Sequence, residues 1–348
     1  MNVIELLQKA VVDQASDIFI IAGLPVSYRT NGRILREEGE RLMPPQTSEF
    51  VQQLYELAQA RDLSPLLERG DDDFSFAIPG LSRFRVSAYK QRGALSAVIR
   101  VITFELPHIG IPAPVMKFAG LSKGMVLVTG PAGSGKSTTL ACLVNQINHT
   151  MEKHIITLED PIEYLHRHDK SIVSQREISI DTLSYVNALR ASLRQSPDVI
   201  LLGEMRDYET MDVAMTAAET GHLVFSTLHT IGAANTIDRI IDVFPANQQR
   251  QIAVQLSMVL QAVISQQLVP AQDATQVPAF EITTVTPAIR NMIRDNKIPQ
   301  IDGTVYSANK EDMHSMDYSL QLLVREGTVA PETALSYASN PEMLKKKL

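Results

Sequence analysis

The sequence is poor in cysteine and has no tryptophan. Of its 348 residues, one is a cysteine, Cys142. A single cysteine cannot form an intramolecular disulfide, and it excludes a zinc site built from several cysteines. Cys142 lies beside Leu140 and Leu143 in a predicted helix. We therefore interpret it as a core thiol.

Three further absences narrow the classes of function. The N-terminal segment MNVIELLQKA has no basic stretch followed by a long apolar stretch, so we expect no secretion signal. Apolar runs such as residues 18–26 stop well short of the roughly 18 residues that a membrane helix needs. The net charge of −7 argues against a broadly basic nucleic-acid binder. We expect a cytoplasmic protein that binds no nucleic acid and contacts a membrane only through a partner.

The composition is that of a globular protein, with 45% hydrophobic and 20% charged residues. A chain of this length exceeds one compact core, which favours two domains. Residues 104–116 contain three prolines and a glycine, which do not fit a helix interior or a central strand. We place a linker there, between an N-terminal domain at 1–103 and a second domain, with a C-terminal helical region, at 117–348.

The N-terminal domain has a mixed α/β pattern. Apolar and polar residues alternate along 83–89, and a turn at 90–93 leads into a second strand, which predicts a β-hairpin. Four arginines, at positions 83, 85, 92 and 100, lie in this hairpin. Their spacing alone favours a solvated face. A cation supplied to a γ-phosphate from outside the nucleotide-binding domain is the alternative.

The second domain alternates strands with helices. Short apolar strands are predicted at 125–129, 154–158, 199–202 and 223–227, each followed by a helical pattern. This alternation indicates an α/β fold with a parallel sheet covered on both faces. Apolar residues from 252 to 264 predict one long amphipathic helix. Thr286 and Pro287 open another.

A phosphate-binding motif follows the first of these strands. Residues 130–137 read GPAGSGKS, which satisfies G-x-x-x-x-G-K-[ST]. Glycines let the backbone amides wrap the phosphates, the lysine places a positive charge on the β- and γ-phosphates, and the serine hydroxyl binds Mg²⁺. We predict that Mg²⁺ and ATP bind here. The predicted nucleotide contacts are Gly130, Pro131, Ala132, Gly133, Ser134, Gly135, Lys136, Ser137 and Thr138.

Acidic residues follow two neighbouring strands. The strand at 155–158 leads into residues 159–163, and the strand at 199–202 leads into residues 203–207. In an open α/β sheet this is where the ligand binds, so one acid can activate water while the other orders Mg²⁺. The second acid is Glu204, preceded by Gly203, where P-loop enzymes commonly use aspartate. Direct and water-mediated metal contact both stay open.

Two histidines bracket the fourth strand. His222 precedes residues 223–227, and His229 follows them. A histidine beside an apolar strand is often a hydrogen-bonded structural residue. The alternative is contact with the γ-phosphate, or a response to its loss.

Three further segments carry a family resemblance. ITLEDPIEYLH at 156–166, LLGEMRD at 201–207 and GHLVFSTLHT at 221–230 resemble the Asp box, the atypical Walker B motif and the His box of the secretion ATPase superfamily. Over residues 16–338 the chain resembles the retraction ATPases of type IV pili. Glycine before glutamate is normal in that superfamily.

The resemblance implies a PAS-like N-terminal domain, a RecA-like ATPase domain and a homohexameric ring. Carried over by position, Glu163 is the general base, and Glu204 orders Mg²⁺ and water. His222 and His229 line the site, and Arg85 and Arg100 reach the nucleotide from the N-terminal domain. The ring would act at the inner face of the cytoplasmic membrane, on an inner-membrane platform protein of the pilus, and power retraction and twitching motility.

Two features favour retraction over extension. Extension and type II secretion ATPases generally carry a four-cysteine zinc loop and extra N-terminal domains, and neither is found in this sequence. AIRNMIR at 288–294 resembles the AIRNLIR signature of retraction motors, with methionine in place of leucine. The alternatives are an extension or secretion ATPase, a nucleotide-gated accessory with low turnover, and a nucleic-acid translocase, which the acidic balance disfavours.

Overall fold

The computed structural model describes residues 2–30, 33–102, 104–107, 109–273, 275–308 and 312–348. The chain forms two compact units. One comprises residues 1–105 together with the short segment 163–165, and the other comprises residues 106–162 and 166–348. The boundary after Glu105 lies within the segment 104–116 that the prolines marked. Val115, near the end of that segment, is fully buried in the core of the second unit.

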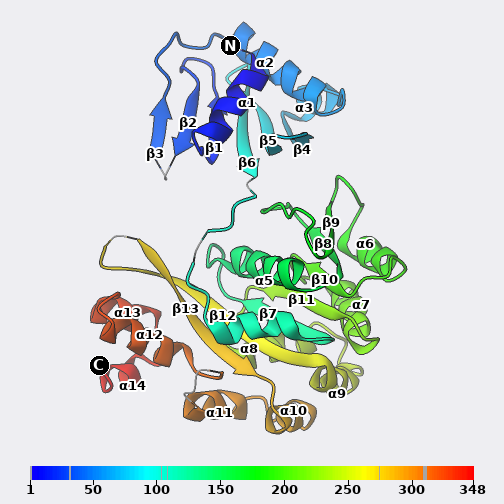
Figure 1. Ribbon diagram of the computed structural model, residues 1–348, viewed down its shortest axis with the longest axis vertical. Helices are drawn as coiled ribbons and strands as arrows, with labels where there is room; N and C mark the ends of the chain where they lie inside the picture. Colours follow the sequence, from blue (N-terminus) through cyan, green and yellow to red (C-terminus); the bar gives the residue numbers. More distant parts are fainter. Residues whose placement is uncertain (1, 31–32, 103, 108, 274, 309–311) are drawn as a thin grey trace. The chain divides into compact units, whose positions relative to one another are not determined.

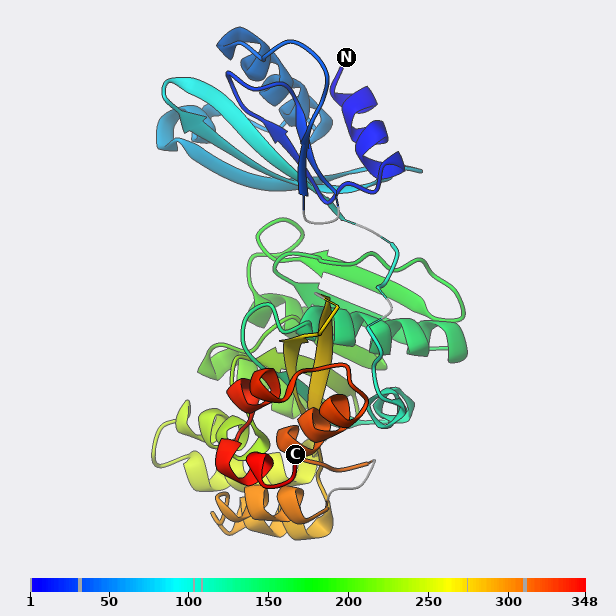
Figure 2. The same cartoon turned by 90° about the vertical axis from the view of Figure 1, so that its left-hand side faces the viewer.

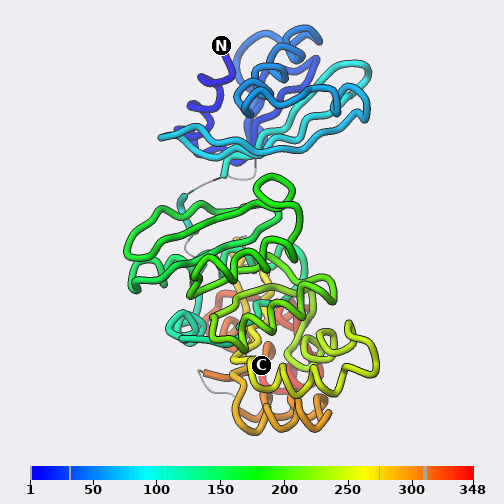
Figure 3. The backbone as a smooth tube through the Cα atoms, turned by 90° about the vertical axis from the view of Figure 1, so that its right-hand side faces the viewer, coloured from blue at the N-terminus to red at the C-terminus, as the bar shows by residue number. Residues whose placement is uncertain are grey.

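The N-terminal unit is an antiparallel sheet with helices on one face (Figures 2 and 3). Its strand order is β3-β2-β1-β6-β5-β4. The elements are α1 (Val3–Val12), β1 (Asp17–Ile20), β2 (Ser27–Thr30), β3 (Arg33–Arg36), α2 (Pro44–Leu57), α3 (Ser64–Arg69), β4 (Asp71–Ile78), β5 (Ser82–Gln91) and β6 (Ala94–Ile102). The predicted hairpin is confirmed as β5 and β6.

Alternation along β5 assigns its two faces. Phe84, Val86 and Ala88 are buried in the core of the unit, while Arg83 and Arg85, which alternate with them, belong to the other face of the sheet. The antiparallel register pairs Arg85 directly with Arg100 on β6.

The second unit is built on a seven-stranded sheet of order β13-β12-β7-β11-β10-β8-β9 (Figure 1). All neighbours are parallel except β12 and β13. The elements up to β11 are α4 (Ala113–Met116), η1 (Lys117–Gly120), β7 (Gly124–Thr129), α5 (Lys136–Thr150), β8 (His154–Glu159), β9 (Ile172–Glu177), α6 (Tyr185–Ser192), β10 (Val199–Leu202), α7 (Tyr208–Glu219) and β11 (Leu223–Leu228). The remaining elements are α8 (Ala233–Asp242), α9 (Gln249–Val259), β12 (Leu260–Pro270), β13 (Gln276–Thr284), α10 (Pro287–Arg294), α11 (Gln300–Ala308), α12 (Met316–Arg325), α13 (Pro331–Tyr337) and α14 (Pro341–Lys345).

Apolar cores lie on both faces of this sheet, as the continuous apolar strands predicted. Met125 and Leu127 of β7 pack into one core, and Val126 and Val128 between them pack into the other. All four side chains are fully buried. A separate core joins the C-terminal helices α12, α13 and α14, drawn in red and orange in Figure 2, to β12 and β13.

The predicted helix over 252–264 is wrong in its second half. Helix α9 ends at Val259, and Leu260 begins β12, which lies beside β7 in the sheet. Leu260, Val263 and Ile264 are all buried there. Their spacing fits a helix as well as a strand buried on both faces, so only the neighbouring strand decides between the two.

The parallel strands define two edges of the sheet. The carboxyl edge carries the ends of β7, β8, β10 and β11, where Leu228 pairs with Thr129 and Leu202 pairs with both Ser226 and Leu158. The amino edge carries the starts of the same strands. The phosphate-binding motif and the predicted acids all follow strands, so the topology assigns them to the carboxyl edge.

No helix among the described residues is both long and apolar enough to cross a membrane.

Candidate nucleotide-binding and hydrolytic site

The phosphate-binding loop connects the end of β7 to the start of α5 and packs against β12. Gly130 and Gly135 have φ values of 142° and 87°, which other residues rarely adopt. A Cβ at Gly130 would lie 2.2 Å from the Gln266 carbonyl oxygen, and one at Gly135 would lie 2.7 Å from Gln266 Nε2. Both glycines are therefore required for the loop to close on this strand.

Lys136 lies over the loop. Its Nζ donates to the carbonyl oxygens of Gly130 (2.9 Å) and Pro131 (2.8 Å), and the residue is 8% exposed. Burial lowers the pKa of Lys136, and the negative charge of Glu204 opposes that shift. Two neutral carbonyls are weak partners for an ammonium, so phosphate oxygens would bind Lys136 more strongly than its present contacts.

The start of α5 fits an anionic ligand as well. The N-cap residue of this helix is Gly135, which has no side chain to cap the first turn, and the positive end of the helix dipole favours an anion there. Ser137 in the first turn is exposed. The buried Ser134 Oγ has no hydrogen-bond partner in the described chain. The cradle thus has the hydrogen-bond donors and the helix N-terminus that a triphosphate and its Mg²⁺ need.

Glu204 follows β10 at the same edge, and its side chain is largely enclosed. Its side chain is 11% exposed, and its carboxylate pairs with Arg206 Nη2 at 2.5 Å and with His229 Nε2 at 3.6 Å. Its negative charge also acts on Lys136, where it opposes the lowering of the lysine pKa by burial. In the described part of the chain, no three His, Cys, Asp or Glu side chains form a metal cluster. A metal here would be shared between the protein and phosphate oxygens, as is usual for Mg²⁺.

Tyr185 explains the glycine before Glu204. A Cβ at Gly203 would lie 2.9 Å from the Tyr185 hydroxyl and 3.4 Å from Glu159 Cα. Burial raises the pKa of Tyr185, and the charges of Glu204, Asp160 and Glu159 raise it further. The phenol therefore stays protonated among these acids. Sequence reasoning missed Tyr185, because nothing in a helix start predicts contact with a loop 18 residues away.

Two of the acids at and after the end of β8 have different surroundings. Glu159 Oε1, at the end of β8, accepts hydrogen bonds from Thr157 Oγ1 (2.6 Å) and Gln175 Nε2 (3.3 Å). Glu163 is half-buried in the loop that follows, in the segment 163–165 that groups with the N-terminal unit. Its role as a general base remains a prediction.

The two histidines lie at opposite ends of β11. His229 follows the strand at the carboxyl edge and contacts Glu204. His222 precedes the strand at the amino edge, where its carbonyl accepts from Gly124 N (3.0 Å) and its Nδ1 contacts Ala217 O (2.9 Å). A six-residue strand spans about 20 Å. The structure therefore brings His229 to the P-loop edge of this unit but places His222 away from it.

Arg85 and Arg100 lie together in the N-terminal unit. They are directly opposed on β5 and β6, where like charges repel. Arg100 Nε donates to Asp17 Oδ1 at 3.1 Å, and its side chain is 53% exposed. The register thus concentrates two cations on one face of the sheet, which spacing alone did not predict.

Polar residues inside β12 are a second set that sequence reasoning missed. Ser265 Oγ contacts Thr129 Oγ1 at 2.7 Å, directly before the P-loop, and Gln266 Oε1 accepts from Thr139 Oγ1 at 2.7 Å. Both residues are almost completely buried. The sequence does contain a sign of them, because the polar triplet SQQ interrupts an otherwise apolar run. A strand that only fills the core does not need polar residues at these positions.

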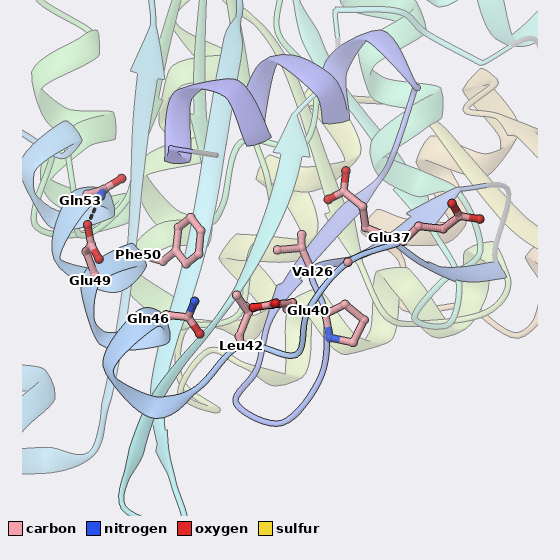
Figure 4. A pocket seen from close by; sticks show the side chains of 11 residues that line it. Val26, Glu37, Glu40, Leu42, Gln46, Glu49, Phe50 and Gln53 are labelled. Carbon is pink, nitrogen blue, oxygen red and sulfur yellow. Dashed lines mark hydrogen bonds between the residues drawn. The ribbon is translucent and has the colours of Figure 1, made fainter.

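A pocket of about 380 Å³ lies in the N-terminal unit (Figure 4). Four glutamates line it together with Val26, Leu42 and Phe50. The glutamates are Glu37, Glu38, Glu40 and Glu49. Their charge repels phosphates, so this pocket is not a second nucleotide site.

A P-loop, an enclosed glutamate and a histidine at one edge of a parallel sheet define a RecA-like P-loop ATPase domain. The family model "Type II/IV secretion system protein" matches residues 2–326. The chain belongs to this family.

Whole-chain relatives narrow the class. A "Twitching motility protein" of Neisseria gonorrhoeae is 44% identical over 99% of this chain and 92% of its own length. The type IV pilus retraction ATPase PilT of Pseudomonas aeruginosa is 43% identical, covering 98% and 99% of the two chains. The crystal structure of the pilus retraction motor PilT with bound ADP superposes with a TM-score of 0.90 at 42% identity, covering 99% of each chain. The predicted fold class and family are confirmed.

Proposed function

We propose that this chain is a Mg²⁺-dependent ATPase that powers type IV pilus retraction. The proposal is carried by one observation at the carboxyl edge. Glu204 contacts His229 there, and its negative charge acts on Lys136 of the P-loop. The whole-chain similarity to retraction ATPases supports the same conclusion. Twitching motility is the behaviour that such a motor would drive.

The roles of the residues follow from their positions. The loop amides and the first turn of α5 would hold the phosphates, and Lys136 would exchange its carbonyl partners for β- and γ-phosphate oxygens. Ser137 and Glu204 would hold Mg²⁺, which neutralises charge on the phosphates. Glu204 would also orient the attacking water, and His229 would contact the γ-phosphate. The Tyr185 hydroxyl would keep Glu204 in its place.

Three further roles come from the family resemblance. Glu163 is proposed as the general base, and the opposed Arg85 and Arg100 as the cations that stabilise charge on the γ-phosphate. The two arginines are direct cross-strand partners, so both could act on one anion, which supports this role. His222 is left out of the hydrolytic site because it lies at the other edge.

The partners are part of the proposal. We expect a homohexamer at the inner face of the cytoplasmic membrane, acting on the inner-membrane platform protein of the pilus. Within the AIRNMIR segment, Arg290 is already engaged, since its Nη1 donates to the Ser257 carbonyl at 2.6 Å at the end of α9. Within the described chain, Arg294 contacts its near neighbours Asn291 and Asp295, and its side chain is 52% exposed, which makes it the stronger candidate for a partner contact.

The test is a count of surface pili on cells that lack this gene. The proposal predicts excess pili on non-motile cells, with normal numbers restored by the parental gene and not by Glu204→Ala. Bald cells would instead assign the chain to pilus extension. A steady-state ATPase assay distinguishes a motor from an accessory protein with low turnover. If DNA does not stimulate the ATPase activity, the nucleic-acid translocase is excluded.

A further inference from the structure

Glu281 is a buried carboxylate outside the nucleotide contacts. It lies on β13, directly opposite Ser265 of β12 in the antiparallel register. Only 9% of the residue is exposed. No lysine, arginine or histidine of the described chain forms an ion pair with it. A buried, unpaired carboxylate is costly unless hydrogen bonds compensate, so its contacts indicate its purpose.

Its contacts join two helices. Ala233 N, at the start of α8, donates to Glu281 Oε1 at 3.2 Å, and Met316 N, at the start of α12, donates to Oε2 at 3.4 Å. Each of these helices is ten residues long and directs its positive end at the carboxylate. One carboxylate therefore holds the first amides of two helices that are far apart in sequence (Figure 1).

The start of α8 is held from the P-loop side as well. Gly232 N donates to Ser265 Oγ at 2.9 Å, and that hydroxyl also contacts Thr129, the last residue before the P-loop. Ser265 and Glu281, as cross-strand partners, thus take consecutive amides of one segment. The same segment begins at His229, three residues before Gly232, and His229 contacts Glu204.

We propose that Glu281 is a positioning residue, whose carboxylate fixes the loop that carries His229 and ties the movement of that loop to helix α12. The inference rests on the hydrolytic role proposed above for the carboxyl edge. A change at the γ-phosphate that moves residues 229–232 must stretch the bond from Ala233 to Glu281. Because the other carboxylate oxygen holds Met316, the C-terminal helices respond to the same movement.

The ionisation of Glu281 falls in the working pH range. Burial raises its pKa to about 7, against the opposing effect of the Ala233 and Met316 amides. The titratable groups that act on it are Asp302 of α11 and Asp317 of α12, and both raise the pKa further. The ionised form accepts both amide hydrogen bonds. We therefore expect the parental kcat to rise as pH increases from about 6 to 8.

The experiment compares Glu281→Gln with Thr283→Val, a matched control on the same face of the same strand. Thr283 is fully buried, and its hydroxyl has no partner in the described chain, so the control removes no hydrogen bond. Glutamine keeps the size of the side chain but presents an NH₂ group to one of the two amides. We expect Glu281→Gln to lower kcat about tenfold, keep the ATP KM within about threefold and flatten the pH profile. The control should change none of these.

Hydrogen exchange without nucleotide provides a readout that does not depend on turnover. Glu281→Gln should speed exchange about tenfold in the segments containing Ala233 and Met316, and Thr283→Val should not. Parental exchange rates in both segments would overturn the inference, as would faster exchange with parental kcat. If the parental protein had no ATPase activity, the proposed function would be overturned. The exchange result would still test whether Glu281 holds the Ala233 and Met316 segments.

If the glutamine variant does not fold, Glu281→Asp takes its place. Aspartate keeps the charge on a shorter side chain, so it should speed exchange in both segments and lower kcat while keeping the pH dependence. An aspartate variant with parental exchange would count against the inference.

Discussion

Strand β10 has a carboxylate at each end, and the two ends behave differently. Asp198, at the amino edge, accepts from His154 N at 2.9 Å and from Lys153 Nζ at 3.1 Å. Burial acts to raise its pKa, but these donors lower it overall. Glu204, at the carboxyl edge, faces a half-exposed histidine, an exposed arginine and the P-loop lysine. Asp198 therefore has a structural role, in which it accepts hydrogen bonds from the start of β8. Glu204 instead faces the place where a ligand would bind.

Backbone groups bond one another at both edges, but two polar side chains at the carboxyl edge are left poorly satisfied. At the amino edge, backbone groups bond one another, as in Gly124 N to the His222 carbonyl and Leu223 N to the Asp198 carbonyl. At the carboxyl edge, Lys136 rests on neutral carbonyls, and the buried Ser134 hydroxyl has no described partner. Polar groups left poorly satisfied at one edge of an otherwise well-bonded sheet mark the place where function is located.

The largest effect on nucleotide binding should come from Lys136→Ala. It removes the only cation placed over the phosphate cradle by this loop, so ATP affinity should fall at least about 100-fold. Binding of a fluorescent ATP analogue measures this. The Thr283→Val protein is a suitable folded control. Retained affinity in the Lys136 variant would show that the carboxyl edge is not the nucleotide site.

Gly203→Ala should have an intermediate effect. The added methyl group lies 2.9 Å from the Tyr185 hydroxyl, so Glu204 must move, and kcat should fall about tenfold with nucleotide affinity retained. Adding Tyr185→Phe removes the atom in conflict and should recover part of the loss. A double variant no faster than Gly203→Ala would mean that Tyr185 does not set the position of Glu204.

His166 should affect stability and leave the chemistry alone. It lies in the connection from the carboxyl edge at the end of β8 to the start of β9, and burial, with a smaller effect of His149, lowers its pKa to about 4 from 6.5. The unfolded chain therefore binds a proton that the folded chain does not between these values, so stability is full above pH 6.5 and falls as pH drops toward 4. His166→Gln should remove about 2 kcal/mol of this acid sensitivity. Urea unfolding at pH 7 and pH 4.5 measures it, and equal acid sensitivity in both proteins would contradict it.

The smallest effect is expected at His222. Its ring accepts or donates within a turn at the amino edge, so His222→Ala should lower stability by about 1 kcal/mol and leave ATP affinity within about threefold. Urea unfolding measures the stability, and binding of the fluorescent ATP analogue measures the affinity. A large loss of ATP affinity would show that the amino edge takes part in the site.

Much of this structure could be predicted from local patterns in the sequence. The P-loop, the strands at 125–129 and 199–202 and the acids after them could be predicted, because each depends on a short motif or on continuous apolar residues. The ends of β11 also followed from the sequence, since two histidines bracketing one parallel strand must lie at opposite edges. The role carried over for His222 from the family pattern did not account for that geometry.

The remaining features depend on contacts between distant segments. Residues 260–264 fit two periodicities, and only pairing with β7 makes them a strand. Tyr185 against Gly203, and Glu281 against Ala233 and Met316, join segments whose separation in sequence hides the contact. The pairing of Arg85 with Arg100 required the register of the hairpin, which a turn prediction places only to within a residue or two.

The most direct test of the contrast between the edges is one ATPase assay on two variants of β10. Glu204→Gln and Asp198→Asn make the same chemical change, carboxylate to amide, at the two ends of one strand. The account predicts that Glu204→Gln binds ATP normally and loses about 10² to 10⁴-fold in kcat, whereas Asp198→Asn keeps kcat within about threefold and loses about 1 kcal/mol of stability. Parental turnover in Glu204→Gln, or a comparable loss of kcat in both variants, would contradict it.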